Sequence, residues 1–183
     1  MQIDLVKATN KDKEVIQNLG RFYVYDMSKY CGFLPGWTTP ASGLYECIDL
    51  SRYWEEADRY PFLIKVDGEV GGFALINKVG STPDVDWNMG EFFIVSKFQG
   101  KGIGREVAER IFNQFHGTWE VMQIPENRAA IEFWNNVIDN YTNGNFQKTN
   151  KTVMEPKPHP MSVLKFKAPQ EGVRKSDIKR IRK

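Results

Sequence analysis

The glycine-rich segment Gln99-Gly100-Lys101-Gly102-Ile103-Gly104 constrains the fold of this chain most. It lies between an aromatic and β-branched run at 86–95, which predicts a strand, and apolar residues at helical spacing over about 103–116, which predict a helix. A glycine-rich turn that opens a helix lets several backbone N–H groups point at one anion, with the positive end of the helix behind them. The segment therefore predicts a phosphate site in a domain that mixes strands and helices.

The spacing of the glycines excludes two familiar phosphate sites. A dinucleotide-binding fingerprint counted from Gly100 needs glycine at position 105, where the sequence has Arg105. A nucleotide P-loop needs serine or threonine after its Gly-Lys pair, where the sequence has Gly102. A different phosphate ligand is expected.

Hydrophobic periodicity predicts the other elements, in the order strand, two helices, three strands, helix, strand, helix, two strands. A strand at 3–8 precedes a helix from about 11, whose buried stripe is predicted to be Val15, Ile16, Leu19, Phe22 and Tyr23. Residues 31–47 are expected to form a loop and 51–57 a short helix. Asp67-Gly68 between apolar runs predicts a hairpin of strands 62–66 and 70–76. A strand at 118–124, a helix at 127–138 and strands at 145–153 and 161–167 follow.

The composition fits one domain with a real core. The chain has 183 residues, of which 41% are hydrophobic, and a net charge of +2, which does not favour a protein that coats nucleic acid or a membrane. No apolar run approaches the roughly 20 residues of a spanning helix, and the start lacks a signal-peptide pattern. Cys31 and Cys47 match no zinc or redox spacing, so we expect two reduced thiols in a cytoplasmic protein.

Two motifs, in order, resemble the GNAT superfamily of N-acetyltransferases. Gln99 to Gly104 is similar to the family's Gln/Arg-x-x-Gly-x-Gly/Ala loop, and Asn127-Arg128-Ala129-Ala130-Ile131-Glu132-Phe133-Trp134 is similar to its Asn-x-x-Ala-Ile-x-Phe-Tyr helix. One helix and one strand separate the motifs, as in the family. The resemblance covers residues 1–167 and implies one α/β (α+β) domain with a mixed, mostly antiparallel sheet of six to seven strands flanked by about four helices.

The resemblance implies acetyl-CoA as cofactor and gives roles to particular residues. The strand end at Phe93, Ile94 and Val95 would bind the pantetheine arm, and a backbone N–H at Ile94 would polarise the thioester carbonyl. Residues 99–105 would bind the pyrophosphate, with Lys101 or Arg105 adding charge, and Asn127 would bind the cofactor arm, cap its helix, or do both. The implied cofactor-binding residues are Phe93, Ile94, Val95, Gln99, Gly100, Lys101, Gly102, Ile103, Gly104, Arg105, Asn127 and Trp134.

Acetyl transfer to an amine needs a proton acceptor, because an alkylammonium has a pKa near ~10.4. Glu91, on the strand that leads to the thioester, is the best-placed carboxylate, although an ordinary role on the open side of the strand is the alternative. Trp134 stands where the family commonly has a tyrosine that protonates the thiolate, and an indole cannot do this. Tyr141 is a weaker candidate for that acid, and release of the thiolate to solvent is another route.

The acceptor side combines aromatic and acidic residues, which suits a cationic amine. They are Tyr23, Tyr25, Tyr30, Phe33, Trp37, Tyr45, Tyr53, Trp54, Tyr60, Asp26, Glu46, Asp49, Glu55, Glu56 and Asp58. A small polyamine-like or aminosugar-like acceptor is favoured, with a peptide or protein amine, or a non-catalytic acyl-CoA-binding module, as alternatives. We expect a monomer or homodimer and no membrane contact. We also expect no metal, because neither His116 nor His159 has a ligand partner at useful spacing.

The stretch 168–183 differs in character from the rest of the chain. It contains six basic and two acidic residues, so the basic charge of the protein is concentrated there. A solvated terminus is the simpler interpretation, and contact with RNA, an anionic substrate or a partner is the alternative.

Overall fold

A computed structural model describes residues 1–154 and 156–169. Its centre is one sheet of seven strands in the order β1-β2-β3-β4-β5-β7-β6, in which β4 and β5 are parallel and all other neighbours are antiparallel. The strands are β1 (Ile3–Lys7), β2 (Arg59–Val66), β3 (Glu69–Asn77), β4 (Trp87–Ile94), β5 (Gly117–Gln123), β6 (Phe146–Val153) and β7 (His159–Ala168). The helices are α1 (Lys13–Cys31), α2 (Arg52–Glu55), α3 (Ile103–Gln114) and α4 (Arg128–Thr142), with short 3-10 turns at Asn10–Asp12 and Ser96–Phe98. The predicted fold class is confirmed; most of the basic stretch, 170–183, lies outside the described residues.

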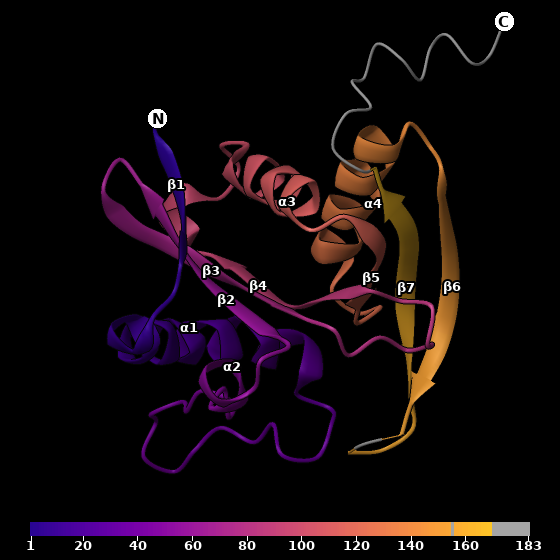
Figure 1. Ribbon diagram of the computed structural model, residues 1–183. Coiled ribbons are helices and arrows are strands. Elements are labelled where there is room, and N and C mark those ends of the chain that lie inside the picture. Colours follow the sequence, from indigo (N-terminus) through magenta and orange to yellow (C-terminus); the bar gives the residue numbers. More distant parts are fainter. Residues whose placement is uncertain (155, 170–183) are drawn as a thin grey trace, which may run out of the picture.

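The helices cover the two faces of the sheet (Figure 1). On one face, α3 and α4 bury Val107, Ile111, Trp134 and Ile138 against the sheet in the larger hydrophobic cluster. On the other face, α1 and α2 pack over β2, β3 and β4 in a smaller cluster that includes Ile16. The molecule therefore has three layers, and β4 contributes side chains to both cores.

The Asp67-Gly68 hairpin is confirmed, and the predicted stripe of the first helix is partly wrong. Asp67 and Gly68 have φ values of 50° and 82°, which is the left-handed geometry of a tight hairpin turn. On α1, Val15 and Phe22 are exposed, because this helix covers one face of a sheet only and its buried line runs through Ile16 and Gly20. Gly20 is required there, since a Cβ would lie 2.1 Å from the Cys47 sulfur.

A bulge at Gly90 reverses the alternation of side chains along β4. Leu75 pairs with Glu91 and Ile76 pairs with Met89, so Gly90 is the extra residue. As a result Met89 lies in the core under α3, whereas Phe93 lies in the core under α1. Glu91 consequently shares the α1 face with Phe93.

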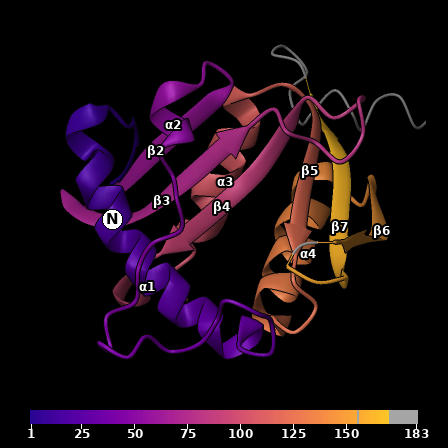
Figure 2. The same cartoon turned by 90° about the horizontal axis from the view of Figure 1, so that it is seen from below.

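The parallel strands β4 and β5 pair only at their beginnings. Their register covers Trp87–Met89 against Trp119–Val121, and β4 continues for five more residues without a partner on that side. Figure 2 shows the two strands diverging from this common start. The second half of β4 therefore has a free edge inside the sheet.

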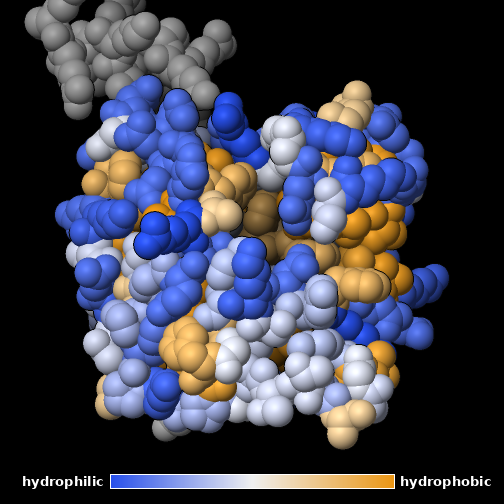
Figure 3. Space-filling model, turned by 180° about the vertical axis from the view of Figure 1, so that it is seen from behind, coloured by the Kyte–Doolittle hydropathy of each residue, from blue (hydrophilic) through white to orange (hydrophobic). Residues whose placement is uncertain are grey.

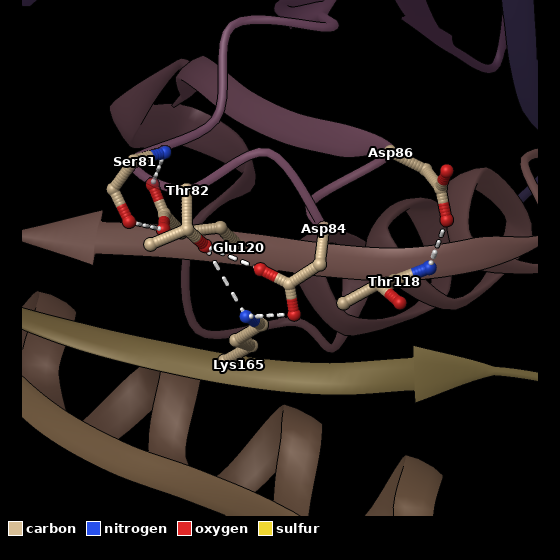
Figure 4. A network of polar contacts seen from close by, with 7 residues as sticks. All are labelled: Ser81, Thr82, Asp84, Asp86, Thr118, Glu120 and Lys165. Atoms are coloured by element: carbon tan, nitrogen blue, oxygen red, sulfur yellow. Dashed lines mark hydrogen bonds and ion pairs between the residues drawn. The ribbon is translucent and has the colours of Figure 1, made fainter.

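The loop between β3 and β4, residues 78–86, is fixed across the paired ends of these strands (Figure 4). Glu120 on β5 is 1% exposed and accepts hydrogen bonds from the Ser81 amide, at 3.1 Å, and the Ser81 hydroxyl. Asp84 pairs with Lys165 of β7 at 2.6 Å. These contacts join the loop to β5 and β7, so they hold β4 and β5 together at the end of the sheet where the two strands pair.

None of the helices in residues 1–154 and 156–169 is both long and apolar enough to cross a membrane.

Candidate active site

A cavity of about 780 Å³ lies where β4 and β5 separate. Its walls come from the end of β4, the loop before α3 and the beginning of α3, the first two-thirds of α4 and the second half of α1. Figure 3 shows a hollow with apolar residues in it near the centre of one face of the molecule. Among the residues implied by the family resemblance, those lining the cavity are Phe93, Ile94, Gln99, Gly100, Gly102, Gly104, Arg105, Asn127 and Trp134.

The loop before α3 forms a cradle of free amides at one end of the cavity. Gly100 and Gly102 have φ values of 70° and 80°, and nothing lies within 4 Å of the place where a Cβ would be. Glycine is therefore required by backbone conformation rather than by space. Within the described residues, the N–H groups from Gly100 to Arg105 have no hydrogen-bond partner in the protein, while the Glu106 N–H begins the helical ladder to Gly102. These amides are available to an anion.

The free edge of β4 presents main-chain groups to the same cavity. The Val95 N–H donates to Gly71 at 2.9 Å, and hydrogen-bonded pairs alternate along an antiparallel ladder. Phe93 and Glu91 therefore bond to β3, and the N–H and C=O groups of Phe92 and Ile94 face the gap. The Gln99 side chain donates to the Ile94 carbonyl at 2.7 Å, which joins the strand end to the cradle.

Helix α4 supplies the opposite wall. Asn127 is its N-cap, since its side-chain oxygen accepts the Ala130 N–H at 3.0 Å. Phe133 stacks on Phe92 with ring centroids 6.0 Å apart, and a Cβ on Gly104 would lie 3.2 Å from the Phe133 ring. Gly104 therefore lets α3 approach this aromatic pair closely.

Glu91 is not among the residues that line the cavity, but it interacts with Tyr23 of α1, which does line it. Its residue surface is partly exposed, and burial of the carboxyl raises its pKa to about 7, although a hydrogen bond with Tyr23 opposes this shift. Burial and the nearby Glu91 charge raise the pKa of Tyr23 well above its usual range. The carboxyl group is thus half ionised near neutral pH, which suits a general base.

Besides Glu91, four predicted residues do not line the cavity. Ile103 is 1% exposed and belongs to the core under α3, Lys101 points to solvent, and the Val95 amide is engaged by Gly71. Tyr141 is also in the core, where its hydroxyl donates to Asn113 at 2.9 Å and its ring packs on Phe112. Helix α4 extends one turn beyond its predicted end and carries Tyr141 into that core, so its position is against a role as the acid.

Helix α1 contributes more to the cavity than its sequence suggested. Tyr23, Asp26, Met27 and Tyr30 line it at i, i+3, i+4 and i+7, which is one face of a helix. The aromatic and acidic composition identified the region, while the individual lining residues needed the helix to be recognised as continuing to Cys31. Lys29 also lines the cavity.

These features define a class of protein: an acyltransferase fold with an amide cradle and a splayed strand. The model of the GNAT acetyltransferase family matches residues 23–137, so the chain belongs to that family. A search of curated protein sequences gave no match.

Three solved structures illustrate the similarity of fold. An acetyltransferase from Thermus thermophilus is 16% identical, with a TM-score of 0.63 over 91% of this chain and 97% of that one. The protein yncA from Salmonella typhimurium, solved with its cofactor acetyl-CoA, is 14% identical, with a TM-score of 0.59 over 93% and 96%. The aminoglycoside acetyltransferase AAC(6')-Ib in complex with coenzyme A is 14% identical, with a TM-score of 0.61 over the full length of both chains.

The cofactor of this family is acetyl-CoA, and the residues present fit it. The unpartnered amides from Gly100 to Arg105 suit a pyrophosphate, and the free N–H and C=O of Phe92 with the free N–H of Ile94 suit an extended amide-containing arm. The Arg105 side chain lines the cavity and adds positive charge to the cradle.

Proposed function

We propose that the protein transfers an acetyl group from acetyl-CoA to a primary amine of a small cationic molecule, by direct attack of the amine. The observation that carries this proposal is Glu91, a carboxyl group with a pKa raised to about 7 by burial, beside the free edge of β4. An ammonium must lose a proton before it attacks, and a base with a pKa near the working pH is well suited to accept it.

When bound, acetyl-CoA supplies an acetyl group activated as a thioester, whose thiol has an ordinary pKa of about 8.5 and leaves readily as its anion. The chain's own groups then have three tasks. The cradle amides would hold the phosphates, the Ile94 N–H, which faces the cavity, would donate to developing negative charge on a carbonyl oxygen, and Glu91 would take the proton of the amine.

The acceptor side favours a cation. Asp26 lines the cavity with a carboxylate, and Tyr23 and Tyr30 present aromatic rings from the same helix face. A carboxylate with aromatic rings attracts an ammonium through charge pairing and cation–π contact. A polyamine-like or aminosugar-like molecule is small enough to use this wall, and a peptide amine is the competing acceptor.

Trp134 gives specific support to a second function, acyl-CoA binding without turnover. It is 6% exposed, lines the cavity at the position of the family's usual tyrosine, and has no proton to donate at useful pH. Seven cavity-lining residues come from α4 and its N-cap, between Asn127 and Val137, and none of them has an acidic group that could protonate the thiolate. This function requires that the protein binds acetyl-CoA and releases no thiol with any amine.

An acceptor panel read by free-thiol release separates these functions. Purified protein is mixed with acetyl-CoA and polyamines, aminosugars or peptides, and the wild type is compared with Glu91→Gln and with the exposed control Glu132→Gln on α4. We expect amine-dependent release that rises with pH through about 7, and a roughly 10²- to 10⁴-fold loss of kcat/KM in Glu91→Gln but not in the control. Thiol release in Glu91→Gln at the wild-type rate would refute the role of Glu91, and no release with any amine would favour the binding module.

A further inference from the structure

Tyr23 is a cavity-lining residue that interacts with Glu91. Tyr23 lines the cavity together with Asp26 and Met27, the next turn of α1, whereas Glu91 is not among the lining residues. Glu91 shares the α1 face of β4 with Phe93, on whose ring Tyr23 packs, and an interaction with the Tyr23 hydroxyl lowers the pKa of the Glu91 carboxyl. An amine in the cavity would therefore meet the phenol before it meets the carboxylate.

Packing fixes the Tyr23 ring in this place. The ring makes edge contacts with Phe73 of β3 and Phe93 of β4, with centroids 6.0 Å away in each case and interplanar angles of 79° and 66°. Both partners are buried. Aromatic pairs of this geometry hold each other in position, so the Tyr23 ring is fixed against the face of the sheet that carries Glu91.

The other groups around Glu91 stay neutral near pH 7. Those whose charge couples to Glu91 are Tyr23 of α1, Cys31 at the end of α1, Cys47 of the following loop and Tyr53 of α2. Burial raises the pKa of each thiol to about 11, and it raises the pKa of both phenols. Of these groups, Glu91 is the one that titrates near neutrality.

We propose that Tyr23 is a catalytic residue that relays a proton from the bound amine to Glu91. As an N–H bond of the ammonium breaks, its proton bonds to the Tyr23 oxygen, and the Tyr23 hydroxyl proton passes to a Glu91 carboxylate oxygen. The products are a neutral amine, a neutral tyrosine and a protonated Glu91, so charge and protons balance. This proposal rests on the proposed amine acetylation and adds the route by which the base acts.

Tyr23→Phe tests the relay, because it keeps the ring and removes the hydroxyl. The control is Ser28→Ala on the same helix, which also removes a hydroxyl; the Ser28 hydroxyl donates to the Tyr25 carbonyl, and Ser28 is not among the residues that line the cavity. We expect kcat/KM to fall 10²- to 10³-fold at every pH in Tyr23→Phe and to stay at the wild-type value in the control. The affinity of Tyr23→Phe for coenzyme A, measured by calorimetry, should equal that of the wild type. Adding Glu91→Gln to Tyr23→Phe should cause little further loss, since both groups serve one relay.

Direct action of Glu91 predicts a different result. Loss of the hydrogen bond that lowers the Glu91 pKa would move the midpoint of the pH profile upward, and Tyr23→Phe would recover wild-type activity above about pH 8. That outcome would overturn the relay while leaving the acetyltransferase proposal intact, whereas wild-type activity in Glu91→Gln would refute the base itself.

If Tyr23→Phe does not fold, the wild-type enzyme still gives an answer. Rates in mixtures of water and heavy water should follow a curved plot when two protons move together, and a straight line would contradict the relay.

Discussion

Replacing Gly102 by alanine tests whether the amides before α3 hold the pyrophosphate of the cofactor. Gly102 has φ +80° and no atom within 4 Å of the place that a Cβ would take, so the substitution adds backbone strain without a clash. The left-handed conformation costs an L-residue about 1–2 kcal/mol. A chain of this length loses about 2–4 °C of Tm per kcal/mol, so the Tm should fall by roughly 2–8 °C.

The backbone can relieve this strain by turning its amides away from the cradle. Losing one hydrogen bond to a charged phosphate costs about 1.5–3 kcal/mol, which is roughly a 10- to 150-fold rise in the Kd for coenzyme A. Titration calorimetry measures the affinity, and differential scanning fluorimetry measures the Tm.

Gly36→Ala is the matched control, because Gly36 has φ +87°, has nothing within 4 Å, and is not among the residues that line the cavity. Both variants should lose similar stability, and only Gly102→Ala should lose affinity. Equal affinity of the two variants for coenzyme A would refute the assignment of the cradle to the pyrophosphate.

Three further predictions concern ionisation and packing. Glu91→Gln should raise the free energy of unfolding relative to wild type by about 3 kcal/mol at pH 8 and not at pH 4.5, because the stability that neutral Glu91 contributes is lost as pH rises from about 4.5 to about 7. Scanning fluorimetry should show the difference as a higher Tm at pH 8, and a difference that does not depend on pH would contradict this. Ser81→Ala should lower the free energy of unfolding in urea by about 1.5–3 kcal/mol, because buried Glu120 loses a hydrogen-bond donor. Amide hydrogen exchange over residues 78–86 should become faster, and unchanged exchange would show that other contacts hold the loop. Tyr141→Phe should lower the free energy of unfolding by about 1 kcal/mol, because the Tyr141 hydroxyl donates to Asn113, and it should leave kcat unchanged. A large fall in kcat would make Tyr141 a candidate acid again.

Local chemistry made some of the fold predictable from the sequence. The Asp67-Gly68 turn needs left-handed backbone at both positions, and the structure has φ values of 50° and 82° there. The amide cradle is also local, since glycine at positions 100 and 102 fixes the path of the chain into α3. Such features depend on neighbouring residues alone, so a single sequence is enough to predict them.

Features that depend on distant partners were less predictable. Phe22 fits the helical period of α1, yet it is 63% exposed because the sheet covers only one side of that helix. Tyr141 follows the second motif closely in the sequence, but α4 turns it toward Asn113 on α3 and away from the cavity. Periodicity gives the spacing of side chains and does not give the direction in which the next layer lies.

The bulge at Gly90 shows how one irregularity decides the chemistry of the site. In a regular strand, Glu91 would share a face with Met89 and be buried under α3. The extra residue turns Glu91 to the α1 face, where Tyr23 lies, while the free amides of Phe92 and Ile94 still face the gap left by β5. The bulge also explains the glycine, since a Cβ at position 90 would lie 2.4 Å from the Tyr53 hydroxyl. The proposed base, Glu91, and the proposed oxyanion donor, Ile94, therefore lie within four residues of one strand, so their separation does not depend on the movement of a loop.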